Sequence, residues 1–428
     1  MVTDELRNRL MKIKKGEVPN GYNKCGIWIM PEDWSIIALE KLTDLIKDGT
    51  HNPPSEKIEG IPLLSVENIK DGKIDFASNT RKISNDDYLA LHKYYEIQNG
   101  DILLTLVGSV GRTAMVENTE RFSIQRSVGV IRANKHIDKL YLKHFIDSPI
   151  VTDQFSDYIH SIPARVGLKD LAKILIIVPK TDKEQQKIAE ILSTWDKAIE
   201  LKEQLIKEKK QQKKGLMRKL LTGEVRLSSF EGEWEEVTID KIAKIYLGLT
   251  YTPTYVSEGV PFLSVKDING GKISFSNTRY ISQSEFENST SNAKPKKGDI
   301  IFGRVGTLGN PIIVEDDVEF CIFVSLGFLR ISSEDILNYF VAHWMDSELF
   351  KRQIESKIAG SSQKNLNTGW LKEFSISMPT VDEQRKISDV LTMSNKEIEL
   401  LTDELEALKI HKKGLMQLLL TGIVRVQC

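Results

Sequence analysis

Cysteine is scarce in this chain, and long apolar segments are missing. The 428 residues include three cysteines, Cys25, Cys321 and Cys428, and no Cys-x-x-Cys pair. This argues against a disulfide framework or a structural zinc site and fits a reducing cytoplasm. The best uncharged apolar run, residues 321–329, is about half as long as a bilayer-spanning helix, and the first residues have no apolar signal core. We therefore expect a cytoplasmic protein that does not associate with a membrane.

An excess of charge of one sign is also missing. The chain has 59 Lys and Arg residues against 60 Asp and Glu residues, which gives a net charge of -1. Wholesale electrostatic capture of nucleic acid is thereby excluded. Any binding to DNA must use local basic surfaces.

The usual catalytic signatures are absent as well. None of the 27 glycines lies two residues from another, so no Gly-x-Gly loop is available for a nucleotide cofactor, and neither a P-loop nor a His-Glu-x-x-His motif occurs. Asn52-Pro53-Pro54 begins like the motif of adenine methyltransferases, but Ser55 stands where the aromatic residue must stack on the base. We predict a chain that is not an enzyme and that itself binds no metal and no cofactor.

The second half of the sequence repeats the first at an offset near 199. Residues 61–66 (IPLLSV) recur as residues 260–265 (VPFLSV), and Gly-Asp-Ile occurs at both 100–102 and 298–300. The segments 184–226 and 383–425 share 21 identities in 43 aligned positions. The period is too long for a solenoid repeat. It indicates a duplicated module, in which one globular domain is followed by one helical segment.

The helical segments carry the same heptad register, which predicts a coiled-coil seam. Its apolar positions are Ile188, Leu192, Trp195, Ile199, Ile206 and Leu216 in the first copy, and Ile387, Leu391, Ile398, Leu401, Leu405, Leu408 and Leu415 in the second. Each helix of about 38 residues, about 57 Å long, should end at Gly223 or Gly422. An internal pseudo-two-fold axis would make the pair antiparallel. The basic stretch 202–219 is explained equally well by a solvated face and by a phosphate or partner contact.

The globular parts, residues 31–180 and 231–379, are predicted to be mixed α and β, so the fold class is α+β. Strands are expected at 102–107, 127–132, 171–178, 300–305 and 323–331, with turns at Asp71-Gly72 and at residues 269–271. The scaffold positions are shared by the two domains, whereas the loops 48–57 and 249–258 differ. This pattern is typical of two binding heads with different targets.

The candidate DNA-binding residues lie in loops at matched positions of the two domains. Two Gly-x-x-Gly turns follow equivalent strands and let the backbone approach a polyanion, while neighbouring arginines reach bases or phosphates. Tight turns and ordinary surface groups explain the same residues, and that alternative stays open. The candidates are Gly108, Ser109, Arg112, Gln125, Arg126, Arg165, Arg304, Thr307, Gln363, Lys364 and Asn365.

Taken in order, these motifs resemble the specificity subunits of type I restriction-modification systems. The resemblance rests on residues 31–34 (PEDW), 48–51 (DGTH), 184–188 (EQQKI), 214–217 (KGLM) and 221–223 (LTG), together with the Gly-Asp-Ile motifs and the Gly-x-x-Gly turns. It implies two target-recognition domains, 31–180 and 231–379, each reading half of a split, asymmetric DNA site. Two conserved helical regions, 181–230 and 380–428, would separate them, and residues 1–30 would complete the second.

The resemblance also implies partners. Two modification (methyltransferase) subunits and the restriction/translocase subunits would assemble with the chain on double-stranded DNA. S-adenosylmethionine, ATP and magnesium would be bound by these partners and not by this chain. Two other readings remain open from the sequence: a self-contained DNA methyltransferase or nuclease with an unrecognised site, and a coiled-coil scaffold that does not bind DNA.

Overall fold

The computed structural model describes residues 4–78, 80–117, 120–156, 159, 164–228, 230–269, 271–358 and 365–427. The chain divides into two compact units. Unit 1 consists of residues 1–202 and 404–428, and unit 2 of residues 203–403. Each unit therefore contains one globular domain together with half of each long helix. We call the globular domains head 1 (residues 31–180) and head 2 (residues 231–379).

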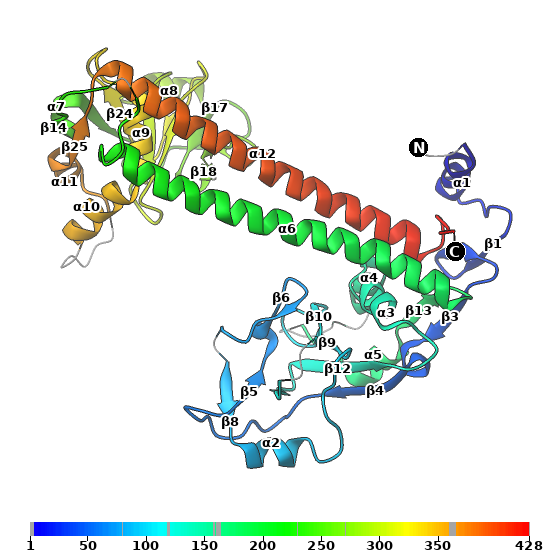
Figure 1. Ribbon diagram of the computed structural model, residues 1–428. Coiled ribbons are helices and arrows are strands. Elements are labelled where there is room, and N and C mark those ends of the chain that lie inside the picture. Colours follow the sequence, from blue (N-terminus) through cyan, green and yellow to red (C-terminus); the bar gives the residue numbers. More distant parts are fainter. Residues whose placement is uncertain are drawn as a thin grey trace. The chain divides into compact units, whose positions relative to one another are not determined.

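Unit 1 begins with a short helix and a β-hairpin and continues into head 1 (Figure 1). Its helices are α1 (Asp4–Lys14), α2 (Asn85–Leu91), α3 (Lys139–Ile146), α4 (Pro149–Ser156) and α5 (Leu168–Lys173). Its strands are β1 (Tyr22–Cys25), β2 (Trp28–Pro31), β3 (Ser35–Ala38), β4 (Thr43–Asp48), β5 (Ile61–Leu64), β6 (Ile69–Lys70), β7 (Lys73–Ile74), β8 (Arg81–Ile83), β9 (Ile102–Thr105), β10 (Thr113–Met115), β11 (Ser123–Ile124), β12 (Val128–Ala133) and β13 (Leu175–Val178).

Unit 2 repeats this order of elements in head 2. Its helices are α7 (Ile239–Ile242), α8 (Gln283–Asn288), α9 (Asn338–Asp346), α10 (Glu348–Ile358) and α11 (Thr368–Glu373). Its strands are β14 (Glu235–Thr238), β15 (Ala243–Leu247), β16 (Tyr255–Val256), β17 (Val260–Leu263), β18 (Ile268–Asn269), β19 (Lys272–Ile273), β20 (Arg279–Ile281), β21 (Ile300–Gly303), β22 (Gly309–Ile313), β23 (Cys321–Ile322), β24 (Leu326–Ile331) and β25 (Ser375–Met378).

The sheets of the two heads have equivalent topology. Each head contains an antiparallel four-stranded sheet, in the order β10-β9-β12-β4 in head 1 and β22-β21-β24-β15 in head 2. A second sheet, β11-β5-β8 or β23-β17-β20-β16, includes one parallel pair. The mixed α and β fold and its duplication, expected from the sequence, are thus confirmed.

The Gly-Asp-Ile motif has a structural role in each head. Asp101 is buried and accepts two hydrogen bonds of 2.8 Å from the guanidinium of Arg132 on β12. Asp299 and Arg330 on β24 form the same pair, with bonds of 2.9 and 2.6 Å. Each motif thereby fixes the start of β9 or β21 to the neighbouring strand.

One expected strand is only partly correct. The run 171–178 was predicted to be a single strand, but α5 continues to Lys173 and only β13, Leu175–Val178, is extended. Leu171 is fully buried from the helical turn. A short apolar run buries its side chains equally well as a helical turn and as a strand, so its periodicity does not distinguish the two.

The two long helices are α6 (Asp182–Leu221) and α12 (Val381–Leu420), each 40 residues long. Both are followed by a glycine at positive φ, Gly223 and Gly422, each at +69°, as the sequence predicted. The predicted turn at Asp71-Gly72 is also present, between β6 and β7. Gly270 of the other predicted turn lies outside the described residues, but β18 and β19 on either side of it pair as a hairpin.

Within each unit the helix halves run antiparallel (Figure 1). In unit 1, Asp196 pairs with Lys412, and Lys202 lies 2.7 Å from Glu404. In unit 2, Lys209 lies 2.5 Å from Glu397. The apolar seam positions named from the sequence are all buried or half-buried, whereas Leu201 and Leu400, one residue before the seam line or next to it, are exposed. The lysines within the seam extend to acidic residues of the opposite helix, as side chains with long apolar stems do.

Each head shares a core with the helix ends in its own unit. In unit 1, Ile188 and Leu192 of α6 pack with Met416 and Leu419 of α12 and with head 1 residues such as Phe145. In unit 2, the corresponding helix ends pack with head 2 residues in the same way. The first turns of one helix and the last turns of the other therefore form the base on which each head is mounted.

Candidate nucleic-acid interface

The candidate interface of head 1 lies at the end of β9, where three loops meet. The loop after β9 is closed by Thr105, whose amide donates to Arg112 O at 2.9 Å and whose Oγ1 accepts from the Arg112 amide at 2.9 Å. Gly108 and Gly111 have φ values of +75° and +95°, which glycine adopts without strain. A Cβ at Gly108 would meet no atom within 4 Å. The tip of the turn is therefore open, and its glycine is required for backbone conformation and not for space.

The other two segments are hydrogen-bonded to the residue that follows β9. The Leu106 amide donates to Ser127 O at 2.8 Å, and its carbonyl accepts from the Val166 amide at 3.0 Å. These bonds place Arg126 and Arg165, the residues just before Ser127 and Val166, beside the turn. Ser109, Arg112, Arg126 and Arg165 are all exposed, and Gln125 is half-buried.

A fourth segment joins the group because Gly49 allows a close crossing. A Cβ at Gly49 would lie 1.9 Å from Ile124 O, so only glycine lets the chain after β4 pass over residues 124 and 125. The Thr50 amide donates to Ile124 O, and the Arg126 amide donates to Thr50 O, both at 3.0 Å. The loop 50–57, which differs between the heads, is thereby anchored next to Gln125 and Arg126.

Head 2 builds the same cluster with the same backbone contacts. The Arg304 amide donates to Ser325 O, and the Leu366 amide donates to Arg304 O, both at 2.9 Å. Gly248 crosses residues 322 and 323 as closely as Gly49 crosses its neighbours. Thr307 and Asn365 are exposed. Gln363 and Lys364, also predicted from the sequence, lie outside the described residues.

Arg304 has a different use from the expected one. Its guanidinium donates to the carbonyl oxygens of Leu366 and Val324, both at 3.1 Å, and burial lowers its pKa. The matched position of head 1 holds the buried Leu106. The contact with a base or phosphate expected for Arg304 is thus replaced, in this structure, by a contact that fixes two loop segments to each other. A half-buried arginine satisfies its donors internally when carbonyls are within reach.

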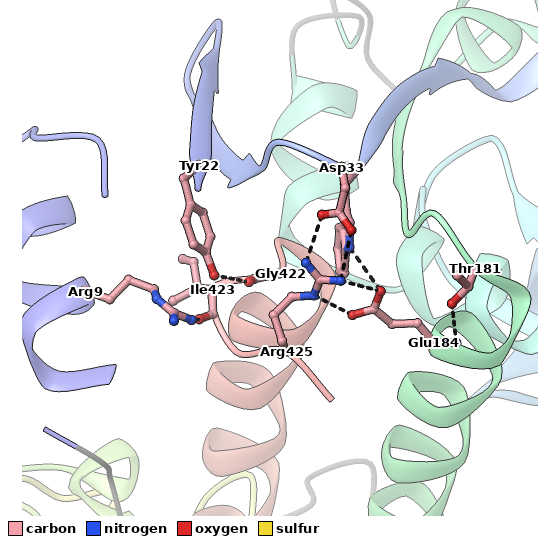
Figure 2. A network of polar contacts seen from close by, with 9 residues as sticks. Arg9, Tyr22, Asp33, Thr181, Glu184, Gly422, Ile423 and Arg425 are labelled. Carbon is pink, nitrogen blue, oxygen red and sulfur yellow. Dashed lines mark hydrogen bonds and ion pairs between the residues drawn. The ribbon is translucent and has the colours of Figure 1, made fainter. Parts of the chain in front are cut away.

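Each head is tied to the long helices by an arginine clamp that sequence reasoning missed. In unit 1, Arg425 donates to both carboxylate oxygens of Glu184, at 2.6 and 2.9 Å, and to Asp33 at 2.9 and 3.2 Å (Figure 2). The indole nitrogen of Trp34 donates to Glu184 at 3.2 Å. Burial on its own would lower the pKa of the Arg425 guanidinium, but the hydrogen bonds to Glu184 and Asp33 raise it overall.

Unit 2 contains the matching clamp. Arg226 donates to Glu383 at 2.6 and 2.7 Å, and the Trp234 indole donates to the same carboxylate at 3.2 Å. In each unit, therefore, the residue four positions after one long helix holds the first turn of the other. Glu184 and Glu383, and Arg226 and Arg425, are identical pairs within the repeat, which is the signal that could have revealed them.

The N-terminal segment joins the clamp of unit 1. The hydroxyl of Tyr22 donates to Gly422 O at 2.8 Å, and Arg9 donates to Ile423 O at 2.6 Å (Figure 2). Residues before position 31 are thus bound to the segment that follows α12. This contact agrees with the prediction that residues 1–30 and 380–428 form one region, without testing the boundaries themselves.

A buried histidine in each unit adds a further link between head and helix. His144 on α3 lies 2.9 Å from Ser193 Oγ on α6, and His343 on α9 lies 3.0 Å from Thr392 Oγ1 on α12. Burial, with nearby lysines adding to it, lowers the pKa of both histidines to about 4. Both side chains are therefore neutral at neutral pH.

No group of His, Cys, Asp and Glu side chains within the described ranges is arranged to hold a metal ion. Among the same residues, no helix is long and apolar enough to cross a membrane. The two free cysteines that the structure describes are Cys25, which is exposed, and Cys321, which is buried.

Comparison with known proteins identifies the family. The type I restriction modification DNA specificity domain matches twice, over residues 31–211 and 231–409. The chain belongs to this family. It is a specificity subunit of the type I restriction-modification class, with two such domains, and its family supplies DNA recognition and not catalysis. Subunits of this class assemble with methyltransferase and restriction subunits.

Individual relatives span nearly the whole chain. The type I restriction enzyme MjaVIII specificity subunit of Methanocaldococcus jannaschii is 27% identical over 424 residues, which cover 93% of this chain and 94% of the relative. The EcoKI specificity subunit of Escherichia coli K12 is 24% identical over 295 residues, 64% of this chain and 62% of the relative. The crystal structure of the S subunit from M. genitalium has the same fold, with a TM-score of 0.56 at 16% identity over 94% of this chain and 97% of that one.

Proposed function

We propose that the chain recognises a bipartite, asymmetric site in double-stranded DNA, with head 1 reading one half-site and head 2 the other. The observation that carries this proposal is the loop cluster, which is built twice from matched backbone contacts but displays different side chains. A common scaffold fixes where the loops lie, and the side chains at their tips vary. Direct readout of two different short sequences requires this combination.

The partners follow from the family. Two modification subunits would carry S-adenosylmethionine chemistry on adenine, and restriction/translocase subunits would use ATP and magnesium. This chain would supply position to both. A protein in the cytoplasm, where DNA is the substrate, fits the sequence composition described above.

A duplicated apolar position on the long helices supports docking of two copies of one partner. Leu201 on α6 is 53% exposed and Leu400 on α12 is 64% exposed, and they occupy equivalent places in the repeat. In unit 1, Leu201 borders a groove of about 690 Å³ that also includes Leu140 of α3 and Ala189 of α6. Exposed leucines at two equivalent places suit one modification subunit on each half. Replacing either leucine with glutamate should remove one of the two subunits from the complex, measured by native mass spectrometry.

The proposed reading of DNA is tested by exchanging a head. Residues 31–180 are replaced with the corresponding head of another specificity subunit, and the sites methylated by the assembled complex are sequenced. We expect one half-site to change while the other half-site is kept. A change in both half-sites, or in neither, would contradict the assignment of one half-site to each head.

The same complex distinguishes the two rival functions. A self-contained DNA enzyme would transfer methyl groups or nick DNA as the purified chain, given S-adenosylmethionine or magnesium. A scaffold that does not recognise DNA would leave no bipartite footprint when bound to its partners. The favoured function requires the opposite result in both assays.

A further inference from the structure

Arginine side chains without a partner gather at the loop cluster of head 1. Of the sixteen arginines in the sequence, most have guanidinium groups that pair with an acid, a carbonyl or an aromatic ring. Five make no such contact with any residue that the structure describes: Arg7, Arg112, Arg126, Arg165 and Arg352. Three of these five lie in the cluster at the end of β9. Arginines spread over a surface to keep a protein soluble would not concentrate in this way.

Backbone hydrogen bonds fix the mutual placement of the three residues. Arg112 bonds through its amide and carbonyl to Thr105, and the residues just after Arg126 and Arg165 bond to Leu106. All three arginines therefore lie within one residue of backbone bonded to the end of β9, while their side chains are exposed. An anchored backbone with a free guanidinium is suited to ligand binding, because only the side chain must be ordered when the ligand binds.

Head 2 replaces all three arginines at the matched positions. Asn310 follows Gly309 as Arg112 follows Gly111, and Asn365 forms the same β-bridge with Val305 that Arg165 forms with Val107. Val324 takes the place of Arg126, with its amide bonded to Leu249 O as the Arg126 amide is bonded to Thr50 O. Arg304, the remaining arginine of this cluster, uses its guanidinium for Leu366 and Val324. Lys364, next to Asn365 in the sequence, lies outside the described residues.

The chemistry of the two sets differs in what each recognises. A guanidinium fork matches O6 and N7 of guanine in the major groove and also neutralises phosphates, whereas amide and hydroxyl groups recognise bases without neutralising charge. We propose that head 1 reads its half-site through Arg112, Arg126 and Arg165, with guanine as the base they bind, and that head 2 reads its half-site through uncharged groups, Thr307 and Asn365 among them. This inference rests on the proposed function, in which each head reads one half-site.

The first test measures affinity against salt concentration. The chain is assembled with its methyltransferase subunits and titrated with a duplex that carries the full site, at several KCl concentrations. Because each phosphate neutralised contributes about 0.9 to the slope of log K against log salt, the triple variant R112Q/R126Q/R165Q should lower the slope by about 2 to 3. The variant T307A/N365A should weaken binding with the slope unchanged.

The matched control is Arg352→Gln. Arg352 on α10 is likewise exposed and without a partner among the described residues, but it lies outside the cluster. Its replacement should change neither slope nor affinity. A triple variant whose slope equals that of the control would overturn the inference. Thermal melting of each complex, and the three single arginine variants, separate loss of DNA contacts from loss of folding.

The second test addresses guanine itself. Replacing guanine with 7-deazaguanine removes the N7 acceptor, and we expect this to weaken binding about tenfold in the head 1 half-site and little in the head 2 half-site. In the triple arginine variant, the same replacement should have no further effect. Equal sensitivity in both half-sites, or none in the head 1 half-site, would refute the guanine assignment. If the wild-type complex bound no bipartite site at all, the proposed function would fail instead, which is a different result.

Discussion

The clamp between Arg425 and Glu184 gives a prediction whose size follows from burial. The Glu184 side chain is 4% exposed, and its carboxylate receives two hydrogen bonds from Arg425 and one from Trp34. Replacing Arg425 with leucine leaves that carboxylate buried with only the indole as a donor. Breaking a buried ion pair in this way costs about 3–5 kcal/mol, a large part of the stability of a typical domain.

Two further variants separate the buried pair from the exposed one. Asp33 binds the same guanidinium, but its side chain is 41% exposed, so Asp33→Asn should cost about 1 kcal/mol or less. The double variant E184Q/R425L removes the buried charge together with its partner. It should be more stable than R425L alone, because a neutral amide is far less costly to bury than a carboxylate.

The assay is urea unfolding followed by circular dichroism, together with hydrogen exchange of peptides from the first turns of α6. We expect the exchange of these peptides to rise in the R425L variant and to be partly restored in the double variant. A cost below about 1 kcal/mol for R425L, or a double variant less stable than R425L, would refute the view that burial of Glu184 makes this clamp strong.

Three further predictions concern spacing, pH and the close crossing of loops. Inserting four residues into α6 lengthens the helix by about 6 Å, so the gap between unchanged half-sites should grow by about two base pairs in the methylated sites; an unchanged gap would mean that the helices do not set the spacing. His144 and His343 have folded-state pKa values of about 4, below the unfolded value of about 6.5. Their contribution is therefore complete above pH 6.5 and is lost as pH falls toward 4, by about 1.4 kcal/mol per unit for each histidine. Urea midpoints at pH 7 and pH 5 should show this loss, and the variant H144Q/H343Q should show less of it; Lys143, Lys412, Lys213, Asp147, Asp196 and Asp346 surround these histidines, and a variant as pH-sensitive as the parent would assign the loss to them. Finally, Gly49→Ala places a Cβ 1.9 Å from Ile124 O and should cost about 1–3 kcal/mol and alter one half-site, whereas Gly108→Ala, with open space, should cost about 1 kcal/mol and leave the half-site unchanged.

The repeat and the helices were predictable from the sequence because they depend on local patterns. The heptad spacing of residues such as Ile188 and Leu192 sets which face of α6 is apolar, and Gly223 ends the helix because it adopts positive φ. The boundaries follow from neighbours within a few positions in the chain. The two copies also supported each other, since the same spacing recurred 199 residues later.

The composition of the candidate interface was only partly predictable. Gly108, Arg112 and Arg165 were named from turn chemistry and charge, but nothing in the sequence shows that Arg165 bridges the turn more than fifty residues earlier. Arg304 seemed equivalent to the exposed arginines in sequence terms. Its internal use depends on the carbonyls of Leu366 and Val324, which only folding brings within reach.

The sequence by itself determined the duplication, the heptad seam, the ends of the long helices and the absence of familiar catalytic motifs, because each is written in residue types at fixed spacing. The tertiary structure alone decided which arginines remain free and which are used internally. It also decided that Glu184 meets Arg425 across 241 positions and that His144 lies buried against α6. Burial and partner choice depend on residues far away in the chain, and a linear pattern does not contain those distances.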